Sequence, residues 1–237
     1  MQKNLGIIGG MGPEATCVLF ERIIKRTDAE RDQDHINITI LNDPSIPDRT
    51  AFLLKEEGAQ DFTAPIKEKA RQLEVSGCDV IAIPCSTSHV LLDDIRTAVD
   101  HAQILDMPKL AAVAAKNTGA SRAGILATDG TVRFGLYERA LCAEGITAIL
   151  PSPATQEKVM AVIYDHAKAG HPIPDDLLDD IFADLEAQGC DTAILGCTEL
   201  SVIGLPESVK GICIIDALSS LAEGCVDACG APLRTLP

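Results

Sequence analysis

The chain has 237 residues, of which 46% are hydrophobic and only 3% aromatic, and its formal net charge is −15 at pH 7. This length suits two α/β lobes with aliphatic cores rather than one small domain. The negative charge argues against nucleic acid or an anionic membrane as a partner, since long-range repulsion would oppose either encounter. No apolar run is long enough to span a membrane, the N-terminus reads as a strand and turn rather than an export signal, and nine cysteines without regular close spacing indicate reduced thiols in the cytoplasm.

The chain opens with a predicted strand, a glycine loop and a helix over residues 14–25. Gly10 and Gly12 let the backbone come close to a ligand, and Pro13 suits a first helical turn. Ala15 stands where the dinucleotide fingerprint has its third glycine, which weakens that motif without excluding it. We interpret the loop as a tight turn lining a small-anion pocket, with a nucleotide site as the alternative.

A second strand, residues 37–42, leads to a loop stiffened by two prolines and then to a helix that begins near Arg49. At this place a guanidinium can grip a carboxylate with two hydrogen bonds. The structural alternative is a surface arginine paired with Asp48 or Asp43. An amphipathic helix over residues 63–76 follows, with Gly77 as its C-cap, and it leads into an apolar strand that ends at Cys85.

Two parts of the chain repeat one another at a nearly constant spacing. Gly77-Cys78-Asp79 introduces the strand ending at Cys85, and Gly189-Cys190-Asp191 introduces the strand ending at Cys197, with matching cysteines 112 residues apart. The predicted strands 103–106 and 212–216 match at an offset of 110, and residues 123–130 mirror the opening strand and turn at an offset of 118. This duplication predicts an α/β fold of two pseudo-symmetric, doubly wound parallel-sheet lobes.

The second lobe contains a predicted strand at 146–150 and helices over residues 156–169 and 175–188. Tyr164 and Lys168 are four residues apart on the first of these helices and therefore share a face. We expect an N-terminal lobe of residues 1–99 plus 209–237 and a C-terminal lobe of residues 100–208. The last strand and helix are predicted to pack back on the first lobe.

Both repeated cysteines stand where an apolar strand passes directly into hydroxyl residues. In open α/β sheets that edge is where ligands bind. If an approximate two-fold axis relates the lobes, Cys85 and Cys197 face each other across the cleft between them, where we expect the active site. One thiolate would remove a proton from a tetrahedral carbon and the opposite thiol would return one to the other face, which inverts the stereocentre.

Such chemistry requires help from the neighbouring residues. A free thiol with a pKa of about 8.5 is only partly ionised at neutral pH. Thr87 and Thr198, with the backbone N–H groups of the turns, are candidates to hold the substrate carboxylate, and His89 and Glu199 are candidates to orient or tune the thiols.

Other interpretations explain less of the pattern. The remaining seven cysteines are best interpreted as small core residues. Metal binding is disfavoured because there is no C-x-x-C motif. A cysteine hydrolase would leave the second cysteine unexplained. A two-lobed protein that closes on a carboxylate without chemistry remains the alternative from another functional class.

Three motifs give the chain a specific resemblance over essentially its whole length: GGMGPE at residues 9–14, IPCSTSH at 83–89 and LGCTE at 195–199. The chain resembles the aspartate/glutamate racemase family, and within it the cofactor-independent aspartate racemases. The resemblance implies two pseudo-symmetric lobes and racemisation by two cysteines without pyridoxal phosphate or metal. It also implies a homodimer, and a side-chain carboxylate held by Arg49 and Lys168, with Tyr164 beside the lysine.

One position departs from the family pattern, which has Asn after the first cysteine where this chain has Ser86. Serine is shorter and needs a water to reach as far as an asparagine amide. We therefore predict an aspartate racemase, with a glutamate or broader amino-acid racemase or a maleate-isomerase-like enzyme as alternatives. The expected residues are catalytic Cys85 and Cys197; substrate-binding Met11, Arg49, Ser86, Thr87, Thr198 and Lys168; and supporting Gly10, His89, Tyr164 and Glu199, with no metal ligand.

Overall fold

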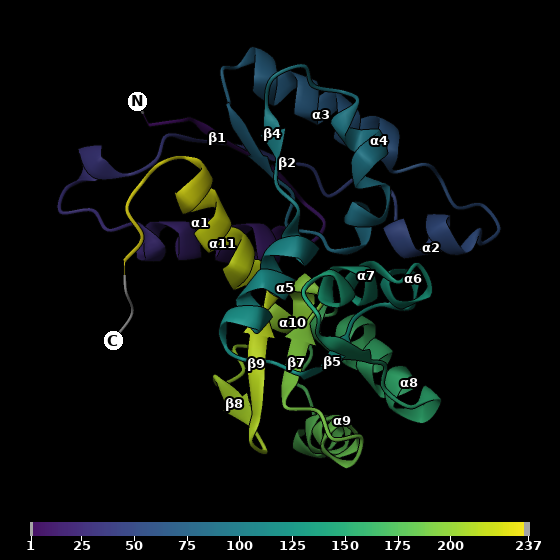
Figure 1. Ribbon diagram of the computed structural model, residues 1–237. Helices are drawn as coiled ribbons and strands as arrows, with labels where there is room; N and C mark the ends of the chain where they lie inside the picture. Colours follow the sequence, from purple (N-terminus) through teal and green to yellow (C-terminus); the bar gives the residue numbers. More distant parts are fainter. Residues whose placement is uncertain (1, 235–237) are drawn as a thin grey trace. The chain divides into compact units, whose positions relative to one another are not determined.

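The computed structural model describes residues 2–234, which divide into two compact units. One unit contains the chain up to Met107 together with the segment from Leu218 onward, and the other contains Pro108–Ala217. Each unit has its own β-sheet with helices packed on it (Figure 1). The predicted α/β class with two lobes is confirmed.

The first unit contains a four-stranded sheet in the order β2-β1-β3-β4, in which every pairing is parallel. Its strands are β1 (Leu5–Gly9), β2 (Ile38–Asn42), β3 (Val80–Ala82) and β4 (Gln103–Ile104). Strands β1 and β3 are buried along their whole length, as expected for central strands covered on both faces.

The second unit repeats this plan and adds an antiparallel edge strand. Its order is β6-β5-β7-β9-β8, with β8 antiparallel to β9 and the other pairings parallel. The strands are β5 (Arg122–Leu126), β6 (Thr147–Ile149), β7 (Thr192–Leu195), β8 (Ser208–Val209) and β9 (Ile212–Asp216).

The two sheets share not only their order but also their register. Val80 pairs with Gln103 in the first sheet, and the residues at the matching offsets, Thr192 and Cys213, pair in the second. The duplication seen in the sequence is therefore present strand by strand. In both sheets the strand order reverses beside the first strand, and the loops after the strands at this point are where α/β proteins bind ligands.

The two Gly-Cys-Asp segments have the same structural role in both units. Gly77 and Gly189 have φ angles of +87° and +72°, and each ends a helix whose last carbonyls accept from the glycine and the following cysteine. Asp79 and Asp191 then accept hydrogen bonds from the backbone N–H groups of Asn4, just before β1, and Arg122, the first residue of β5. The motif thus connects a helix, a turn and two strands.

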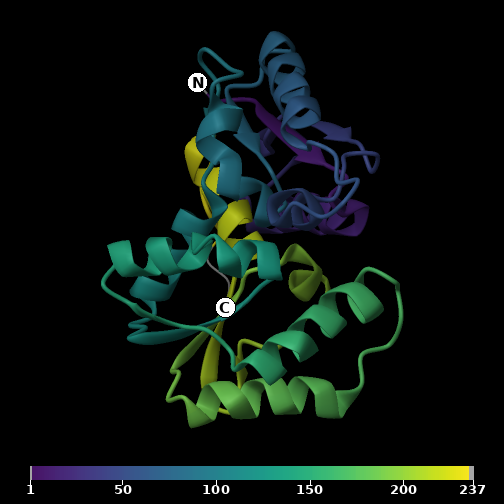
Figure 2. The same ribbon diagram turned by 90° about the vertical axis from the view of Figure 1, so that its right-hand side faces the viewer.

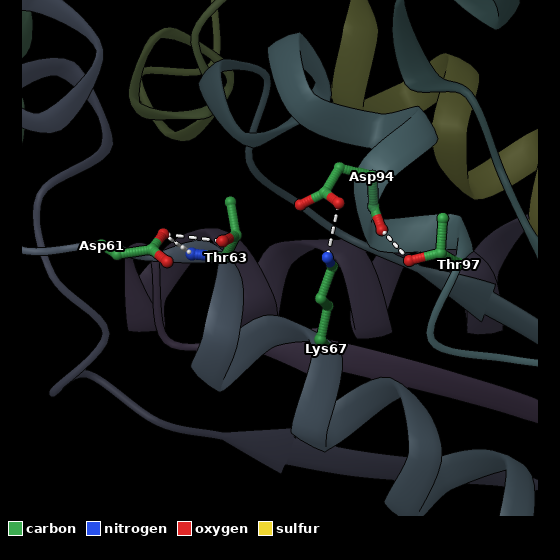
Figure 3. A network of polar contacts seen from close by, with 5 residues as sticks. All are labelled: Asp61, Thr63, Lys67, Asp94 and Thr97. Carbon is green, nitrogen blue, oxygen red and sulfur yellow. Dashed lines mark hydrogen bonds and ion pairs between the residues drawn. The ribbon is translucent and has the colours of Figure 1, made fainter.

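Helices of the first unit pack against its sheet and each other. They are α1 (Pro13–Arg26), α2 (Arg49–Leu54), α3 (Thr63–Val75), α4 (Leu92–Arg96) and α11 (Ala217–Ala228), with short 3-10 turns η1 (Asp32–Asp34) and η2 (Thr87–Leu91). Figure 3 shows how α3 and α4 are joined, since Lys67 donates to Asp94 Oδ1 over 2.5 Å. In the same view, Asp61 accepts from the N–H and hydroxyl of Thr63, the first residue of α3. These contacts hold the helix that follows η2.

Helices of the second unit are α5 (Met107–Asn117), which starts at the boundary, α6 (Asp129–Arg133), α7 (Leu136–Ala143), α8 (Pro153–Ala161), α9 (Asp175–Ala187) and α10 (Thr198–Val202). A π-helical turn, η3 (Val162–Ala167), continues directly from α8. Helices α8 and α9 pack on each other (Figure 2), and α9 buries Ile181 and Leu185 as its pattern predicts.

Two expectations about the last strands need correction. Strand β9 lies in the second sheet beside β7, whereas the sequence interpretation placed it in the first lobe; conversely, β4 pairs with β3 in the first sheet, outside the second lobe where residues 100–208 were expected. The physical reason is the duplication itself, because each lobe needs its own strand beside the cysteine strand. Only the final helix, α11, belongs to the first unit as expected.

Candidate active site

Cys85 follows β3 in a turn that we call the Cys85 turn, residues 83–89. The Cys85 N–H donates to the carbonyl of Ile83 over 2.8 Å, and its own carbonyl accepts from the hydroxyl of Ser88 over 2.7 Å and from Nδ1 of His89 over 2.9 Å. Cys85, Ser86, Thr87 and His89 are all buried. Hence His89 contacts the main chain of the cysteine, and its Nδ1 carries the proton because a carbonyl only accepts.

The glycine loop after β1 lies beside this turn at the carboxyl edge of the same sheet, because β1 and β3 are neighbours. Gly10 has a φ angle of +99°, and a Cβ atom there would lie 2.3 Å from the carbonyl carbon of Asp43. Its N–H donates to Oγ1 of Thr16 over 3.0 Å. Met11 is buried in the same hydrophobic cluster as Cys85. Close backbone approach to the Asp43 loop therefore requires glycine here.

Arg49 is the first residue of α2, and its guanidinium Nη1 donates to the carbonyls of Ile46 and Pro47 over 3.3 and 3.0 Å. The two acidic residues suggested as its partners have other contacts. Asp48 caps α2 by accepting from the N–H of Ala51, and Asp43 pairs with Lys69 over 2.5 Å. Hydrogen bonds from Lys69 and Ser45 lower the pKa of Asp43 to about 2. The loop thus orients the arginine through its carbonyls.

The second cysteine stands in the matching turn, residues 195–201, which we call the Cys197 turn. Cys197 is the N-cap residue of α10, and its Sγ donates to Oε2 of Glu199 over 2.8 Å. The hydroxyl of Thr198 lies 3.4 Å from the same carboxylate oxygen. Burial raises the pKa of the Cys197 thiol well above its ordinary value, and the charge of Glu199 and its hydrogen bond raise it further, while Lys168 lowers it.

Tyr164 and Lys168 come from the π-helical turn η3 and its C-terminal end, which pack against α10. The Lys168 ammonium lies 4.0 Å from the centre of the Tyr164 ring, a cation–π contact. The predicted continuous α-helix over residues 156–169 is wrong at this point, since the chain changes to i→i+5 hydrogen bonding after Ala161. Such π-helical turns occur frequently at functional sites.

The structure thus brings the expected residues together in two groups, each inside one unit. The first group surrounds the Cys85 turn and the second surrounds the Cys197 turn. The sequence interpretation missed the polar residues behind these turns, namely Ser88, Ser201, Asp106 and Asp216. The repeat offset was the available indication, because His89 and Asp106 match Ser201 and Asp216 at the same 112- and 110-residue spacings.

Within residues 2–234, no group of three or more His, Cys, Asp and Glu side chains is arranged to hold a metal ion. No helix in that part of the chain has the length and apolarity needed to cross a membrane.

Both units are doubly wound α/β folds, and in each a buried cysteine follows the third strand at the carboxyl edge of the sheet. Comparisons with known proteins identify the family. The family model of Asp/Glu/hydantoin racemases matches residues 8–224, and the chain belongs to that family.

Individual relatives cover nearly the whole chain. An aspartate racemase of Picrophilus torridus has a similar structure, with a TM-score of 0.82, 32% identity, and coverage of 98% of this chain and 96% of that chain. A broad-specificity amino-acid racemase of Bacillus subtilis is 27% identical over 231 residues, 94% of this chain and 96% of the relative. A glutamate racemase of Bacillus anthracis, 15% identical with a TM-score of 0.69 over 95% of this chain and 81% of that chain, shares the fold. The protein is an amino-acid racemase of this family.

Proposed function

We propose that the protein interconverts L- and D-aspartate by a two-base proton transfer in which Cys85 and Cys197 act on opposite faces of the α-carbon, without a cofactor. The observation that carries the proposal is the equivalence of the two cysteines. Each follows the third strand of its sheet, the two strands pair with β1 and β5 in the same register, and each cysteine is buried. A single nucleophile would not require this repetition, and the position of both cysteines after the carboxyl ends of their strands, where α/β sheets bind ligands, favours chemistry over a structural role.

In the proposed reaction one cysteine, as thiolate, takes the α-proton, and the electron pair remains on the substrate as a carbanion conjugated with its carboxylate. The other cysteine, as thiol, gives its proton to the opposite face. The hydroxyls of Ser86, Thr87 and Thr198, with the adjacent N–H groups and Met11 of the glycine loop, hold the α-carboxylate as its charge grows. Transfer in the reverse direction exchanges the roles of the two cysteines.

We assign recognition of the substrate's second carboxylate to two cations, Arg49 and Lys168. Arg49 is oriented by the carbonyls of Ile46 and Pro47, and Lys168 is held over the ring of Tyr164. A planar guanidinium suits a carboxylate because two parallel hydrogen bonds fix its orientation. Two such cations favour an acidic amino acid as the substrate.

Aspartate is the first candidate because the Picrophilus torridus relative is named an aspartate racemase. A wider substrate range is the second, since the Bacillus subtilis relative is a broad-specificity racemase and Ser86 leaves more room than the asparagine of the family pattern. We also propose, on the family resemblance alone, that the chain works as a homodimer in the cytoplasm.

The test uses purified protein without added cofactor, incubated in deuterated water with L-aspartate, L-glutamate or L-lysine in separate reactions. NMR follows loss of the α-proton signal, and chiral chromatography follows the enantiomers. We expect deuterium uptake and D-aspartate formation, with a kcat/KM for aspartate at least tenfold above the other two amino acids. Comparable rates with lysine would favour the broad-range alternative, and no exchange with any amino acid would refute the proposal.

Two variants separate the two-base scheme from a one-base reaction. Cys85→Ser and Cys197→Ser should each lose racemisation by at least a factor of about 1,000, because a hydroxyl is a far weaker acid than a thiol. Cys17→Ser, at an exposed position, is the matched control and should keep full activity. Full turnover in either active-site variant would contradict the scheme.

A further inference from the structure

Each cysteine is accompanied by a second repeated feature, which consists of one polar residue later in its turn and one aspartate from the neighbouring strand. His89 and Ser201 each stand four residues after their cysteine. On the strand next to the cysteine strand, Asp216 is the last residue of β9, and Asp106 follows the end of β4 by two residues. Asp216 is in register with Leu195, two residues before Cys197. Asp106 has the matching position after β4, because the Leu105 N–H donates to Ile81 and so continues the same ladder.

In the Cys197 turn, the hydroxyl of Ser201 donates to Oδ1 of Asp216 over 2.6 Å. Ser201 lies on α10 and Asp216 at the end of β9, so this hydrogen bond closes the strand-to-helix connection that contains the cysteine. The side chain of Ser201 is only 2% exposed. In such a buried setting an unpaired hydroxyl or carboxylate would be unfavourable, which keeps the pair together.

In the Cys85 turn, the equivalent place is occupied by a histidine. His89 is 4% exposed, and its Nδ1 donates to the Cys85 carbonyl. The hydroxyl of Ser88 donates to the same carbonyl. Burial lowers the pKa of His89, whereas the Cys85 and Leu105 carbonyls and the negative charge of Asp106 act in the opposite direction and Arg96 adds to the lowering. At neutral pH the imidazole is therefore uncharged and its proton stays on the nitrogen facing the cysteine.

We propose that His89 with the Cys85 carbonyl, and Ser201 with Asp216, are equivalent positioning pairs, each of which fixes the turn that carries one catalytic cysteine. The inference rests on the proposed two-cysteine reaction. Each pair then controls proton transfer on one face of the substrate only. Neither His89 nor Ser201 exchanges a proton with substrate in this scheme. His89 acts through the Cys85 carbonyl, and Ser201 acts through its hydrogen bond to Asp216, which joins α10 to the end of β9.

The physical reason is the short range of proton transfer. A thiol must lie within hydrogen-bonding distance of the α-carbon proton, and a displacement of 1 Å can reduce the rate about 100-fold. The Cys85 carbonyl belongs to the residue whose side chain reacts, so holding it fixes the direction of the Cα–Cβ bond. Loss of one pair should slow transfer at one cysteine and leave the other unchanged.

The experiment compares wild type with His89→Ala and Ser201→Ala, using L- and D-aspartate carrying deuterium at the α-carbon. Each variant should lose about 10- to 100-fold in kcat/KM. Slower proton transfer at one cysteine makes that transfer rate-limiting. The primary isotope effect should therefore rise for the enantiomer that gives its deuteron to that cysteine, and it should fall for the other enantiomer. The two variants should show this asymmetry with opposite enantiomers.

Two further variants distinguish positioning from a general loss of structure. His89→Gln keeps a side-chain N–H donor for the Cys85 carbonyl and should recover most of the rate, while Asp216→Asn should resemble Ser201→Ala. Ser76→Ala serves as the control. It removes the 2.7 Å hydrogen bond from the Ser76 hydroxyl to the Gln72 carbonyl, which lies outside both cysteine turns, and its isotope effects should equal those of wild type. Equal changes for both enantiomers in His89→Ala and Ser201→Ala would overturn the inference.

A second readout does not depend on the substrate. The alkylation rates of Cys85 and Cys197 by iodoacetamide, followed by mass spectrometry, should change only at Cys85 in His89→Ala and only at Cys197 in Ser201→Ala. If wild type fails to racemise aspartate while these selective changes occur, the proposed function is wrong and the positioning pairs stand. If wild type is active but both thiols change together, the positioning pairs are wrong.

Discussion

The thiol of Cys197 donates its hydrogen bond to the carboxylate of Glu199, two residues further along the chain, over 2.8 Å. Burial, the charge of Glu199 and this hydrogen bond all raise the pKa of the thiol, while the Lys168 ammonium and the backbone N–H of Glu199 act against them. In the resting protein Cys197 is therefore protonated at neutral pH. In the proposed reaction it is ready to donate a proton, and it needs a change in its surroundings before it can accept one.

Replacing Glu199 by Gln should make Cys197 more reactive as a nucleophile and less effective in racemisation. Removal of the negative charge lowers the pKa of the thiol and so raises its thiolate fraction at a pH below the pKa. We expect the alkylation rate of Cys197 at pH 7.5 to rise above that of wild type. Mass spectrometry of the alkylated peptide measures it.

Lys168→Met provides the opposite change, because loss of the ammonium should raise the pKa of Cys197 and slow its alkylation. Cys142, an exposed thiol, is the internal reference in both variants. An unchanged alkylation rate in both Glu199→Gln and Lys168→Met would contradict the electrostatic account of this turn.

Gly10→Ala should destabilise the first unit strongly. Its Cβ would lie 2.3 Å from the Asp43 carbonyl carbon, and the backbone φ of +99° disfavours any L side chain. We expect a loss of about 3 kcal/mol or more in the free energy of unfolding, with loss of activity because the loop beside Cys85 moves. Urea unfolding at pH 7.5 measures the first quantity.

Gly119→Ala separates backbone strain from the steric clash. Gly119 has a φ angle of +84°, and a Cβ there would meet no atom within 4 Å. This variant should lose only about 1 kcal/mol and keep its activity. Equal losses in the two glycine variants would show that close approach to Asp43 is not what requires glycine at position 10.

Much of the fold could be predicted from the sequence because the repeats carry it. The Gly-Cys-Asp segments fix a helix end, a turn and two strand contacts in each unit, so their spacing predicts both sheets. The placement of β9 could not be predicted in the same way. Its pattern is apolar in either sheet, and only pairing with β7 decides between them.

The candidate site, like the fold, could be predicted from the sequence only in part. Both cysteines and the hydroxyl residues after them were recognisable from strand ends. The π-helical turn at Val162–Ala167, which packs against α10, was not, because its residues have ordinary helical preferences. Likewise, the sequence suggested that His89 tunes a thiol, while its observed contact is with the Cys85 carbonyl.

Arg49→Lys should raise KM for aspartate about tenfold or more and change kcat less. Lysine keeps the positive charge but cannot give two parallel hydrogen bonds to a carboxylate. It also lacks the planar group through which Arg49 is oriented by Ile46 and Pro47. Arg71→Lys is the matched control, because Arg71 is an exposed partner of Glu68, and its KM should stay that of wild type. An unchanged KM in Arg49→Lys would remove Arg49 from the substrate site.

The free energy of unfolding should fall at alkaline pH because several thiols are buried in the native protein. Burial raises the pKa of Cys229 to about 11, and burial raises that of Cys225 well above its ordinary value. In the unfolded chain thiols ionise at about pH 8.5. Above this pH the unfolded state binds fewer protons than the native state, so stability decreases as pH rises until the native thiols ionise as well.

Each such thiol lowers the free energy of unfolding by at most about 1.4 kcal/mol per pH unit within this window, and it has no effect on the slope below about pH 8. Cys229→Ala removes one contribution, so its stability should decline less steeply than that of wild type between pH 9 and 10.5, although a small cavity lowers its value at pH 7. Urea unfolding at several pH values measures both slopes. Cys17→Ala, at an exposed position, should leave the wild-type slope unchanged. A wild-type slope in Cys229→Ala would show that the native thiol ionises as freely as an unfolded one.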